Sequence, residues 1–467
     1  MSLKAKASVA PSAHAPEPVP LAVGQGESPA FGRKALFAYG ALGLPLAFAA
    51  LPIYVHTPRL YAEGLGLPLT LVGTVLLAAR AVDAVTDPLL GWLSDRVARR
   101  RGLITVAMPA MVVALFALLN PPSDAGAAWL AVSVFGVTLA YSLASINYHA
   151  WGAELGRTPF ERTRLVAHRE GCALAGVVMA AALPAMLADD LRAGMAALAW
   201  LLVPIALLAV ITTLGGTPHW DGRRAADRIG GGMGERPLDG LSVPPYRAAL
   251  LPAVRVALSH PAFGRLLAVF AANGIAAAIP ATTVLFFVAD VLEGDHWSGG
   301  FLALYFVSAA ASLPLWVKLS ARIGKVRAWL WAMGLAVGVF AWAYSLGAGD
   351  LLAFALICML SGAALGADLM LPPAIVADVL AAEPVGAEPR AGVWFGLWNL
   401  VNKGNLALAA GLALPLLGSF GYAPGAREPA ALQALATIYA LLPVVLKLLA
   451  GYLLWCWRER LEQGRVV

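Results

Sequence analysis

Apolar stretches long enough to cross a bilayer follow one another along almost the whole chain, separated by short polar segments. A helix rises only about 1.5 Å per residue, so about 20 largely apolar residues are needed to span the hydrocarbon core. The pattern predicts about twelve membrane-spanning helices. They are expected at residues 36–57, 69–94, 103–120, 127–152, 170–188, 195–214, 264–291, 298–320, 328–346, 351–376, 392–416 and 432–456.

A longer polar segment divides the predicted helices into two sets of six. It holds three consecutive glycines, several prolines and several arginines, a composition typical of a linker. We therefore expect an all-α polytopic membrane protein with five parts. These are a disordered cytoplasmic tail (1–32), an N-terminal six-helix bundle (33–215), a cytoplasmic linker (216–262), a C-terminal six-helix bundle (263–457) and a cytoplasmic tail (458–467).

The basic residues favour one side of the membrane. Most of the 33 Lys and Arg residues fall in the N-terminal tail, the C-terminal tail and the loops after even-numbered spans. By the positive-inside rule, this asymmetry predicts that both termini are cytoplasmic. The pI of about 9.3 then reflects membrane topology, and no nucleic-acid partner is expected. No signal peptide is recognisable in the Ala-rich chain, which indicates a bacterial inner membrane.

Composition and motifs exclude several classes of protein. Hydrophobic residues make up 60% of the chain and charged residues only 13%, which a soluble domain of this size does not show. The three cysteines are scattered, so neither a disulfide framework nor a metal site is predicted. The chain has no phosphate-binding loop, nucleophile elbow or zinc-protease motif. We expect neither an enzyme nor an ATP-driven pump, and no cofactor.

An internal repeat coincides with the division into halves. The loop at 93–101 and the loop at 319–327 have basic or identical residues at most corresponding positions. Secondary transporters use duplicated halves around a central site for alternating access. The repeat therefore favours a transporter of this kind.

The span 69–94 carries Arg80, Asp83 and Asp87. A charge at the bilayer centre costs about 2.5–3.5 kcal/mol on insertion scales, so such residues usually face a polar cavity. On a helix, Asp83 and Asp87 project only about 40° apart, with Arg80 and Thr86 nearby. Two such carboxylates can hold a sodium ion or carry a proton. The alternative is a structural ion pair with Arg80, although one arginine cannot neutralise both acids.

The span 392–416 combines polar and aromatic side chains one turn apart. Its candidate solute contacts are Trp394, Trp398, Asn399, Asn402 and Lys403. Lys403 is too deep to reach the membrane surface. We expect it to pair with an acid of the span 69–94 or to bind an anionic or hydroxyl-rich solute. The alternative is a purely structural counter-ion.

Other polar residues lie within predicted spans. Tyr148, His149 and Trp151 combine aromatic rings with polar atoms, which suits the faces of sugars. Asp368 is a further intramembrane acid, and Arg80 is a further candidate solute contact. A packing role is the alternative for His149, and Asp368 is equally open to a gating role.

Several motifs resemble one transporter family. The stretch Gly91–Arg96, with the basic run behind it, resembles the cytoplasmic loop signature of the major facilitator superfamily. The stretch Arg80–Pro88 resembles the second-helix motif of the glycoside–pentoside–hexuronide:cation symporters, the melibiose-permease type. Further similarity lies in residues 154–169 and 377–403, so the resemblance covers nearly the whole chain.

The resemblance implies roles for individual residues. The positions matching Asp83 and Asp87 would hold the coupling cation, with Ser142 or Ser145 contributing from the span 127–152. A sugar-binding acid of the first span is replaced around Leu44, so a galactoside is not the expected solute. Charges at the cytoplasmic ends are expected to close an inner gate or to serve as ordinary topology charges. They are Asp95, Arg96, Glu154, Arg162 and Arg169.

Taken together, the sequence predicts a monomeric cation-coupled symporter of the major facilitator fold, driven by sodium or protons. Its solute is by default a sugar or glycoside. One alternative is a carrier of an amphipathic solute such as a lysolipid, since lysophospholipid carriers resemble the same family. Another is a non-transporting membrane scaffold or sensor that keeps the fold.

Overall fold

The computed structural model describes residues 31–97, 99–188, 190–218, 249–383 and 391–462. Most of the expected N-terminal tail and of the linker lie outside these ranges, as does the C-terminal end of the second tail. Every described element is a helix. The expectation of an all-helical chain is therefore confirmed for the described residues.

The N-terminal half holds the elements up to residue 216. They are α1 (Arg33–Gly40), α2 (Gly43–Leu51), η1 (Pro52–His56), α3 (Thr57–Glu63), α4 (Leu69–Val97), α5 (Arg100–Leu119), α6 (Ala127–Leu155), α7 (Pro159–Leu187) and α8 (Leu191–Gly216). The rest belong to the linker and the C-terminal half. They are α10 (Leu250–Ser259), α11 (Pro261–Phe286), η2 (Phe287–Val291), η3 (Asp295–Trp297), α12 (Ser298–Ile323), α13 (Lys325–Ala343), α14 (Leu351–Ala381), α15 (Ala391–Ser419), α16 (Pro429–Ala436), η4 (Thr437–Leu441) and α17 (Leu442–Glu462).

Ten helices in the described ranges are long and apolar enough to cross a membrane. Helix α4 is not one of them, although it has 29 residues, and it contains five charged side chains. The first predicted span is also absent from the ten, because it is divided among α1, α2, η1 and α3. The count of twelve spans thus stays a prediction.

The π-helical turn within the first span has a local cause. The π-helical segment η1 begins at Pro52, which has no N–H to donate to the preceding turn. Losing that donor favours a local shift of the hydrogen-bond register, and a short π-helical turn is one such shift. The expected single helix at 36–57 is therefore wrong in detail.

Helix α7 begins well before the predicted span 170–188. Thr158 caps it: its side chain accepts a hydrogen bond from the Glu161 N–H at 3.1 Å, and the Glu161 carboxylate accepts from the Thr158 N–H at 3.4 Å. This reciprocal capping box fixes the helix start. The hydropathy pattern missed the first turns of α7 because they contain four charged residues. These are Glu161, Arg162, Arg164 and Arg169.

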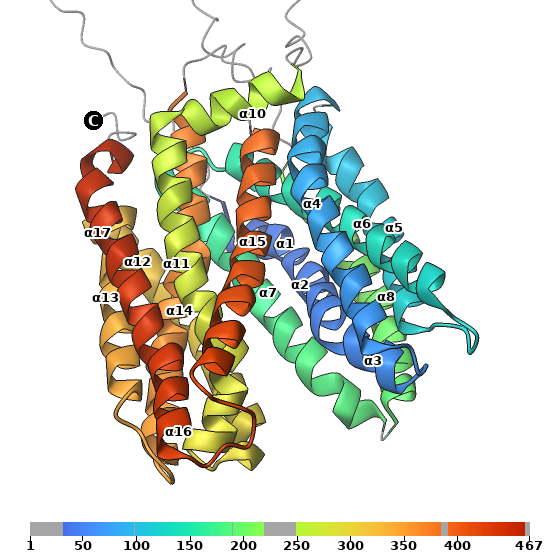
Figure 1. Ribbon diagram of the computed structural model, residues 1–467. Helices are drawn as coiled ribbons and strands as arrows, with labels where there is room; N and C mark the ends of the chain where they lie inside the picture. Colours follow the sequence, from blue (N-terminus) through green and yellow to red (C-terminus); the bar gives the residue numbers. More distant parts are fainter. Residues whose placement is uncertain (1–30, 98, 189, 219–248, 384–390, 463–467) are drawn as a thin grey trace, which may run out of the picture.

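Helix α10 lies across one end of the molecule, in the segment expected to be a linker (Figure 1). Ala253 and Ala257 are one turn apart and buried, so one face of α10 packs on the bundles beneath. The C-terminal end of α17 lies at the same end of the molecule (Figure 1). We call this end the α10 end.

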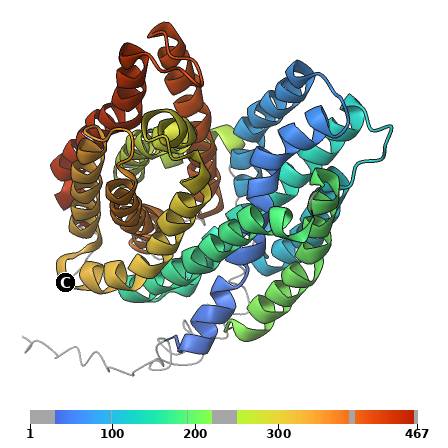
Figure 2. The ribbon, with the colours of Figure 1, turned by 90° about the horizontal axis from the view of Figure 1, so that it is seen from below.

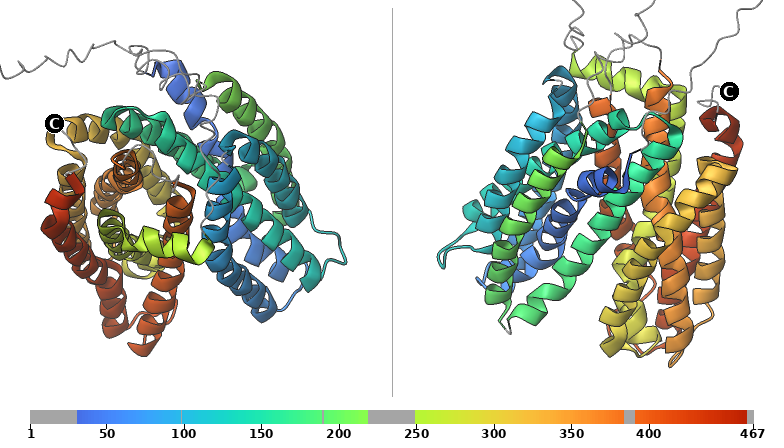
Figure 3. Two further views of the ribbon diagram at one scale, coloured as in Figure 1. Left: turned by 90° about the horizontal axis from the view of Figure 1, so that it is seen from above. Right: turned by 180° about the vertical axis from the view of Figure 1, so that it is seen from behind.

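The two halves converge at the α10 end and diverge toward the opposite end (Figure 1; Figure 3, right). Seen end-on, each half is a separate bundle, and they meet along α4 and α7 on one side and α12, α14 and α15 on the other (Figures 2 and 3). One apolar core joins Leu90, Ile146 and Val166 to the C-terminal half. A separate core around Phe287, within the C-terminal half, fills the opposite end.

Close contact between α4 and α15 depends on glycine. A Cβ atom on Gly91 would lie 2.2 Å from the Gly392 carbonyl oxygen, and one on Gly392 would lie 2.2 Å from the Gly91 carbonyl oxygen. Only residues without a Cβ allow these backbones to approach so closely. Gly91 begins the loop signature noted in the sequence, but nothing in the sequence marks Gly392 as its partner.

Candidate functional site

Lys403 of α15 lies against two aspartates of α4, across the interface between the halves. Its Nζ is 3.0 Å from Asp83 Oδ2 and 3.0 Å from Asp87 Oδ2. It donates hydrogen bonds to Asp87 Oδ1 at 3.1 Å and to Ser142 Oγ of α6 at 2.8 Å. The contact with Asp83 is an ion pair without hydrogen-bond geometry. Three helices therefore meet at one ammonium group.

Helical spacing brings these groups together. Asp83 and Asp87 are one turn apart on α4, and Asn399 and Lys403 are one turn apart on α15. Asn399 Nδ2 donates to Asp87 Oδ2 at 3.0 Å, so both residues of α15 contact the same carboxylate. Gly396 lies two turns before Lys403, and a Cβ there would be 2.6 Å from the Asp87 carbonyl oxygen. The cluster thus lies next to a close approach of α4 and α15.

The cluster is closed off from its surroundings. Asp83, Asp87 and Lys403 are 2%, 0% and 8% exposed, respectively. Burying unpaired charges costs several kcal/mol each, whereas paired and hydrogen-bonded charges are tolerated. Arg80 lies one turn before Asp83 on α4, so α4 and α15 together supply two basic residues for the two acids. In this region, α4 alone has two acids and one base, and Lys403 of α15 supplies the second base.

A cation at this site would be bound by oxygen atoms. No group of three or more His, Cys, Asp or Glu side chains that could hold a metal ion occurs in the described ranges. Besides the two carboxylates, the cluster offers Ser142 Oγ. Thr86 Oγ1 is also buried, and it has no hydrogen-bond partner among the residues that the structure describes. Such hard oxygen ligands suit sodium, and the acids alone suit a proton.

The Ser145 hydroxyl forms a hydrogen bond within its own helix and not with the acids. Its hydroxyl donates to the Ser142 carbonyl oxygen at 3.3 Å within α6. The structure thus brings Ser142, and not Ser145, to the ion pair.

Two tryptophans of α15 stack inside the C-terminal half. Trp394 stacks on Phe263 with ring centroids 4.3 Å apart, and Trp398 stacks on Phe270 at 3.7 Å. Both phenylalanines belong to α11. Asn402, next to Lys403, is exposed and does not join the buried cluster.

The aromatic residues of α6 divide between two places. Tyr148 and Trp151 contact Tyr39 of α1, with ring centroids 4.8 and 5.9 Å apart. Tyr39 also donates to the Tyr148 carbonyl oxygen at 3.1 Å, so this group is part of the N-terminal core. His149 instead faces Phe395 of the other half at 5.7 Å. Of the three, His149 is the one at the interface.

Asp368, expected as a solute contact or gate, forms a second buried ion pair within the C-terminal half. Lys447 Nζ is 2.8 Å from Asp368 Oδ2 and donates to Asn273 Oδ1 at 2.7 Å. Trp329 Nε1 donates to Asp368 Oδ1 at 2.8 Å. The four residues come from α14, α17, α11 and α13. Asp368 therefore connects helices of one bundle, and its hydrogen bonds and ion pair do not include Lys403.

At the α10 end, Asp95 of α4 caps the first turn of α15. Its carboxylate accepts from the Gly392 N–H at 2.7 Å and from the Val393 N–H at 2.9 Å. Unpaired N–H groups and the helix dipole make a helix N-terminus favourable for a negative charge. Arg100 holds the carboxylate from the other side at 2.9 Å, and it also contacts Glu154 at 2.6 Å.

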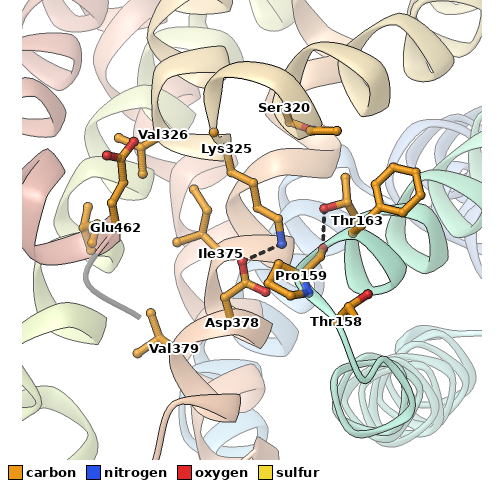
Figure 4. Close-up of a pocket in the computed structure, with 14 residues that line it drawn as sticks. Thr158, Pro159, Thr163, Ser320, Lys325, Val326, Ile375, Asp378, Val379 and Glu462 are labelled. Atoms are coloured by element: carbon orange, nitrogen blue, oxygen red, sulfur yellow. Dashed lines mark hydrogen bonds and ion pairs between the residues drawn. The ribbon is translucent and has the colours of Figure 1, made fainter. Parts of the chain in front are cut away.

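A second contact between the halves involves Asp378 of α14. Arg162 Nε of α7 is 2.7 Å from Asp378 Oδ1, and Lys325 Nζ of α13 is 2.6 Å from Asp378 Oδ2. Lys325 and Asp378 border a cavity of about 270 Å³ and point toward each other there (Figure 4). Thr158 and Thr163 of the N-terminal half line the same cavity. One acid thus links a base of each half.

Of the five predicted gate residues, Asp95, Glu154 and Arg162 belong to these two clusters. Arg96 is exposed and lies over the Trp92 ring at 4.0 Å. Arg169 lies in the interior of the N-terminal half, where it pairs with Glu170. Arg100, Lys325 and Asp378 also belong to these clusters, although the sequence did not predict their contacts. A signal was available only for Asp378, an acid at the end of an apolar span.

Removing the acid at Asp378 is expected to loosen the α10 end. Asp378→Asn leaves Arg162 and Lys325 as neighbouring like charges, whereas Arg162→Gln leaves the Lys325 pair intact. We expect a cysteine at Thr163, in a background without native cysteines, to react about tenfold faster with a maleimide in Asp378→Asn, equivalent to about 1.4 kcal/mol.

Glu428→Gln, which removes an exposed acid at the opposite end, is the matched control. Arg162→Gln should give an intermediate rate. Equal rates in Asp378→Asn and Glu428→Gln would contradict a closing role for this cluster.

Comparisons with known proteins agree with the helical architecture. A family model described as MFS/sugar transport protein matches residues 36–458. The inner membrane symporter YicJ of Escherichia coli (strain K12) is 32% identical over 130 residues, which cover 26% of this chain and 28% of that protein. The putative glycoside/cation symporter YagG of the same strain is 32% identical over 123 residues, covering 25% and 27%. The chain thus matches less than a third of the length of either relative.

A solved structure extends the comparison of folds. A bacterial homologue of the iron transporter ferroportin, in an outward-facing state, has a TM-score of 0.64 at 16% identity and covers 91% of this chain and 99% of its own. At that identity, the likeness concerns the fold alone. The family match extends over most of the chain and includes the α4 and α15 motifs. The chain therefore belongs to the MFS/sugar transport proteins, the glycoside–pentoside–hexuronide:cation symporter family of the major facilitator superfamily, which is a family of membrane transporters and not of enzymes.

Proposed function

We propose that this protein is a symporter that couples the entry of a sodium ion or a proton to that of a small solute, by default a sugar or glycoside. The observation that carries the proposal is the position of Lys403, whose ammonium lies 3.0 Å from both Asp83 and Asp87. The ammonium group of Lys403, from the C-terminal half, thus lies where a cation bound to the two acids of the N-terminal half would lie.

The charge balance explains how coupling would arise. A cation that enters between the two acids competes with the Lys403 ammonium for the same carboxylates and repels it at close range. Repulsion between like charges is strong at low dielectric, so cation binding favours the departure of Lys403 from the acids. The released ammonium then needs a hydroxyl-rich or anionic partner. A solute that supplies this partner stabilises the cation-bound form, and the two therefore move together.

The same exchange would control the two halves. Lys403 links α15 to α4, so its release removes one of the contacts that hold the halves together. A cation and a solute bound together replace that link, whereas either alone leaves an unpaired charge. This difference is what alternating access requires, because a ligand changes the conformational equilibrium only through its different affinity for the two states.

We further propose the orientation and topology of the chain. The first two spans would be α1–α3 together and α4, which completes twelve, and the α10 end would be cytoplasmic because basic residues gather there. The contacts of Asp95 and Asp378 lie at this end, and the halves diverge at the other (Figure 1). The arrangement would then be outward-facing, and the bacterial inner membrane would be its location.

Residues near Lys403 suit a hydroxyl-rich ring. Asn399 supplies an amide, Trp398 an aromatic ring that stacks on Phe270, and His149 approaches from the other half. A few polar groups beside aromatic rings are typical of the residues that line a small-molecule site. No residue here selects a particular sugar, so the solute is proposed by class only.

Thermal unfolding of the purified full chain tests this proposal. We expect one class among neutral sugars, uronates and lysolipids to raise the unfolding temperature, and to raise it further with sodium or at lower pH. A ligand at about 100 times its Kd stabilises the folded state by about 2.7 kcal/mol, which such a measurement resolves.

Proteoliposome uptake of that solute under an imposed sodium or proton gradient then identifies the coupling ion. Stabilisation by lysolipids alone would replace the sugar proposal with that of an amphipathic carrier. Stabilisation by no solute in either ion would favour a scaffold or sensor. Lys403→Gln serves as the control for charge recognition: it should weaken binding of uronates more than that of neutral sugars.

A further inference from the structure

A groove separates α13 from α17 near the α10 end. It has a volume of about 480 Å³ and lies outside the interface between the halves. Its lining residues are Arg327, Leu330, Trp331, Gly334, Trp455 and Arg458. Two cations and two indole rings thus surround one cavity, and none of them belongs to the proposed transport site.

Both arginines have capacity for an anion. Arg327 is exposed and has no ion-pair or hydrogen-bond partner among the described residues. Arg458 stacks on the Trp455 ring at 3.9 Å and donates to the Trp455 carbonyl oxygen at 3.1 Å. Its nearest carboxylate, on Glu459, is 3.5 Å away and 77% exposed, so solvent weakens that pair. Arginine guanidinium groups bind phosphate oxygens through several N–H donors at once.

The walls of the groove indicate a ligand with an apolar part. Trp331 and Trp455 are 70% and 56% exposed, and Tyr452 and Leu448 continue the exposed apolar surface along α17. Tryptophan beside arginine is typical of the membrane interface. Gly334 lies deeper along α13, and a Cβ atom there would meet no atom within 4 Å. The groove therefore continues from two cations into open apolar space.

We propose that this groove binds one anionic phospholipid from the bilayer. Its phosphate would lie between Arg327 and Arg458, and an acyl chain would run along α13 over Gly334. A free phosphate would satisfy the arginines but would leave the open apolar space unfilled, so the observations favour the lipid. This inference is independent of the transported solute and of the coupling ion.

Native mass spectrometry of the detergent-purified full chain tests the inference. The probe is dioleoylphosphatidylglycerol, and dioleoylphosphatidylcholine, which has no net charge, is the comparison. We expect one phosphatidylglycerol to stay bound preferentially. Each arginine near a membrane surface changes affinity for an anionic lipid on the order of five-fold, so Arg327→Gln/Arg458→Gln should bind it at least about tenfold more weakly.

Two further variants separate the groove from general surface charge. Arg322→Gln removes an exposed arginine at the end of α12, outside the groove, and should leave binding unchanged. Gly334→Leu keeps both arginines but fills the apolar space, and should weaken binding of the lipid without weakening binding of inorganic phosphate.

Three results would overturn the proposal. The first is that the protein retains the two lipids equally. The second is that Arg322→Gln loses as much phosphatidylglycerol binding as the double variant does. The third is that millimolar phosphate displaces the lipid. An unchanged unfolding temperature shows that each variant is folded, and Gly334→Leu provides an independent answer if the double variant is not.

Discussion

Asp87→Asn is expected to abolish cation-driven uptake, reducing the initial rate at least about a hundredfold. Asp87 is fully buried and accepts hydrogen bonds from both Asn399 and Lys403, so it joins α4 to two polar groups of α15. The neutral amide cannot carry a proton and binds sodium much more weakly than a carboxylate does, and it leaves Lys403 with Asp83 as its acidic partner. Uptake of the solute into proteoliposomes, with and without an ion gradient, measures the effect.

The stability of the same variant separates folding from coupling. Breaking a buried ion pair by removing one partner costs about 3–5 kcal/mol, because the remaining charge is uncompensated. Asp87→Asn should therefore unfold at a lower temperature, and Asp87→Asn/Lys403→Gln should recover stability while remaining inactive. Asp124→Asn, in an exposed loop, is the control and should behave like the unaltered chain. Gradient-driven uptake by Asp87→Asn would refute the proposed cation site.

The second large effect is expected at Gly91 and Gly392. A Cβ on either residue would lie 2.2 Å from a backbone oxygen of the opposite helix, a distance that side-chain movement cannot relieve. Gly91→Ala or Gly392→Ala therefore forces α4 and α15 apart at the α10 end. Overpacking typically costs about 1–3 kcal/mol. If it destabilises only the conformation in which the halves are in contact at the α10 end, the equilibrium between conformations shifts about 5- to 150-fold.

Spin labels at Arg99 and Arg322, exposed positions in different halves, report this shift as a change in distance. We expect the distribution to move to longer distances in both variants, together with loss of uptake. Matched controls exist on the same helices, since a Cβ on Gly73 of α4 or Gly404 of α15 would meet nothing within 4 Å. If Gly73→Ala or Gly404→Ala moved the distribution equally, close approach at Gly91 would not be the cause.

Both predictions concern contacts between α4 and α15, which is where the structure adds most to the sequence. The internal repeat indicates two related halves, yet the positions 226 residues after Asp83 and Asp87 hold Ala309 and Leu313. The site is therefore asymmetric: the N-terminal half supplies the acids, and the C-terminal half supplies Lys403. An apolar equivalent in the other half explains why one cation site, and not two, is proposed.

The sequence by itself determined the helical membrane architecture and the residues most costly to place in it. Both follow from local properties, because hydropathy and the energy of burying a charge depend on each segment alone. Helix spacing also placed Asp83 with Asp87 and Asn399 with Lys403 on shared faces. The same local reasoning failed at η1 and at the start of α7, where a proline and a capping box decide the hydrogen bonding.

Only the tertiary structure decided which distant groups meet. Lys403 and Asp87 are 316 residues apart, and Asp95 and Gly392 are 297 apart. Their contact depends on the crossing of α4 and α15, which is set by glycines that carry no charge or hydropathy signal of their own. The structure likewise assigned Asp368 to Lys447 and Arg169 to Glu170, away from the roles expected of them. The sequence shows that a charge within a span needs a partner, but the packing of the helices determines which residue that partner is.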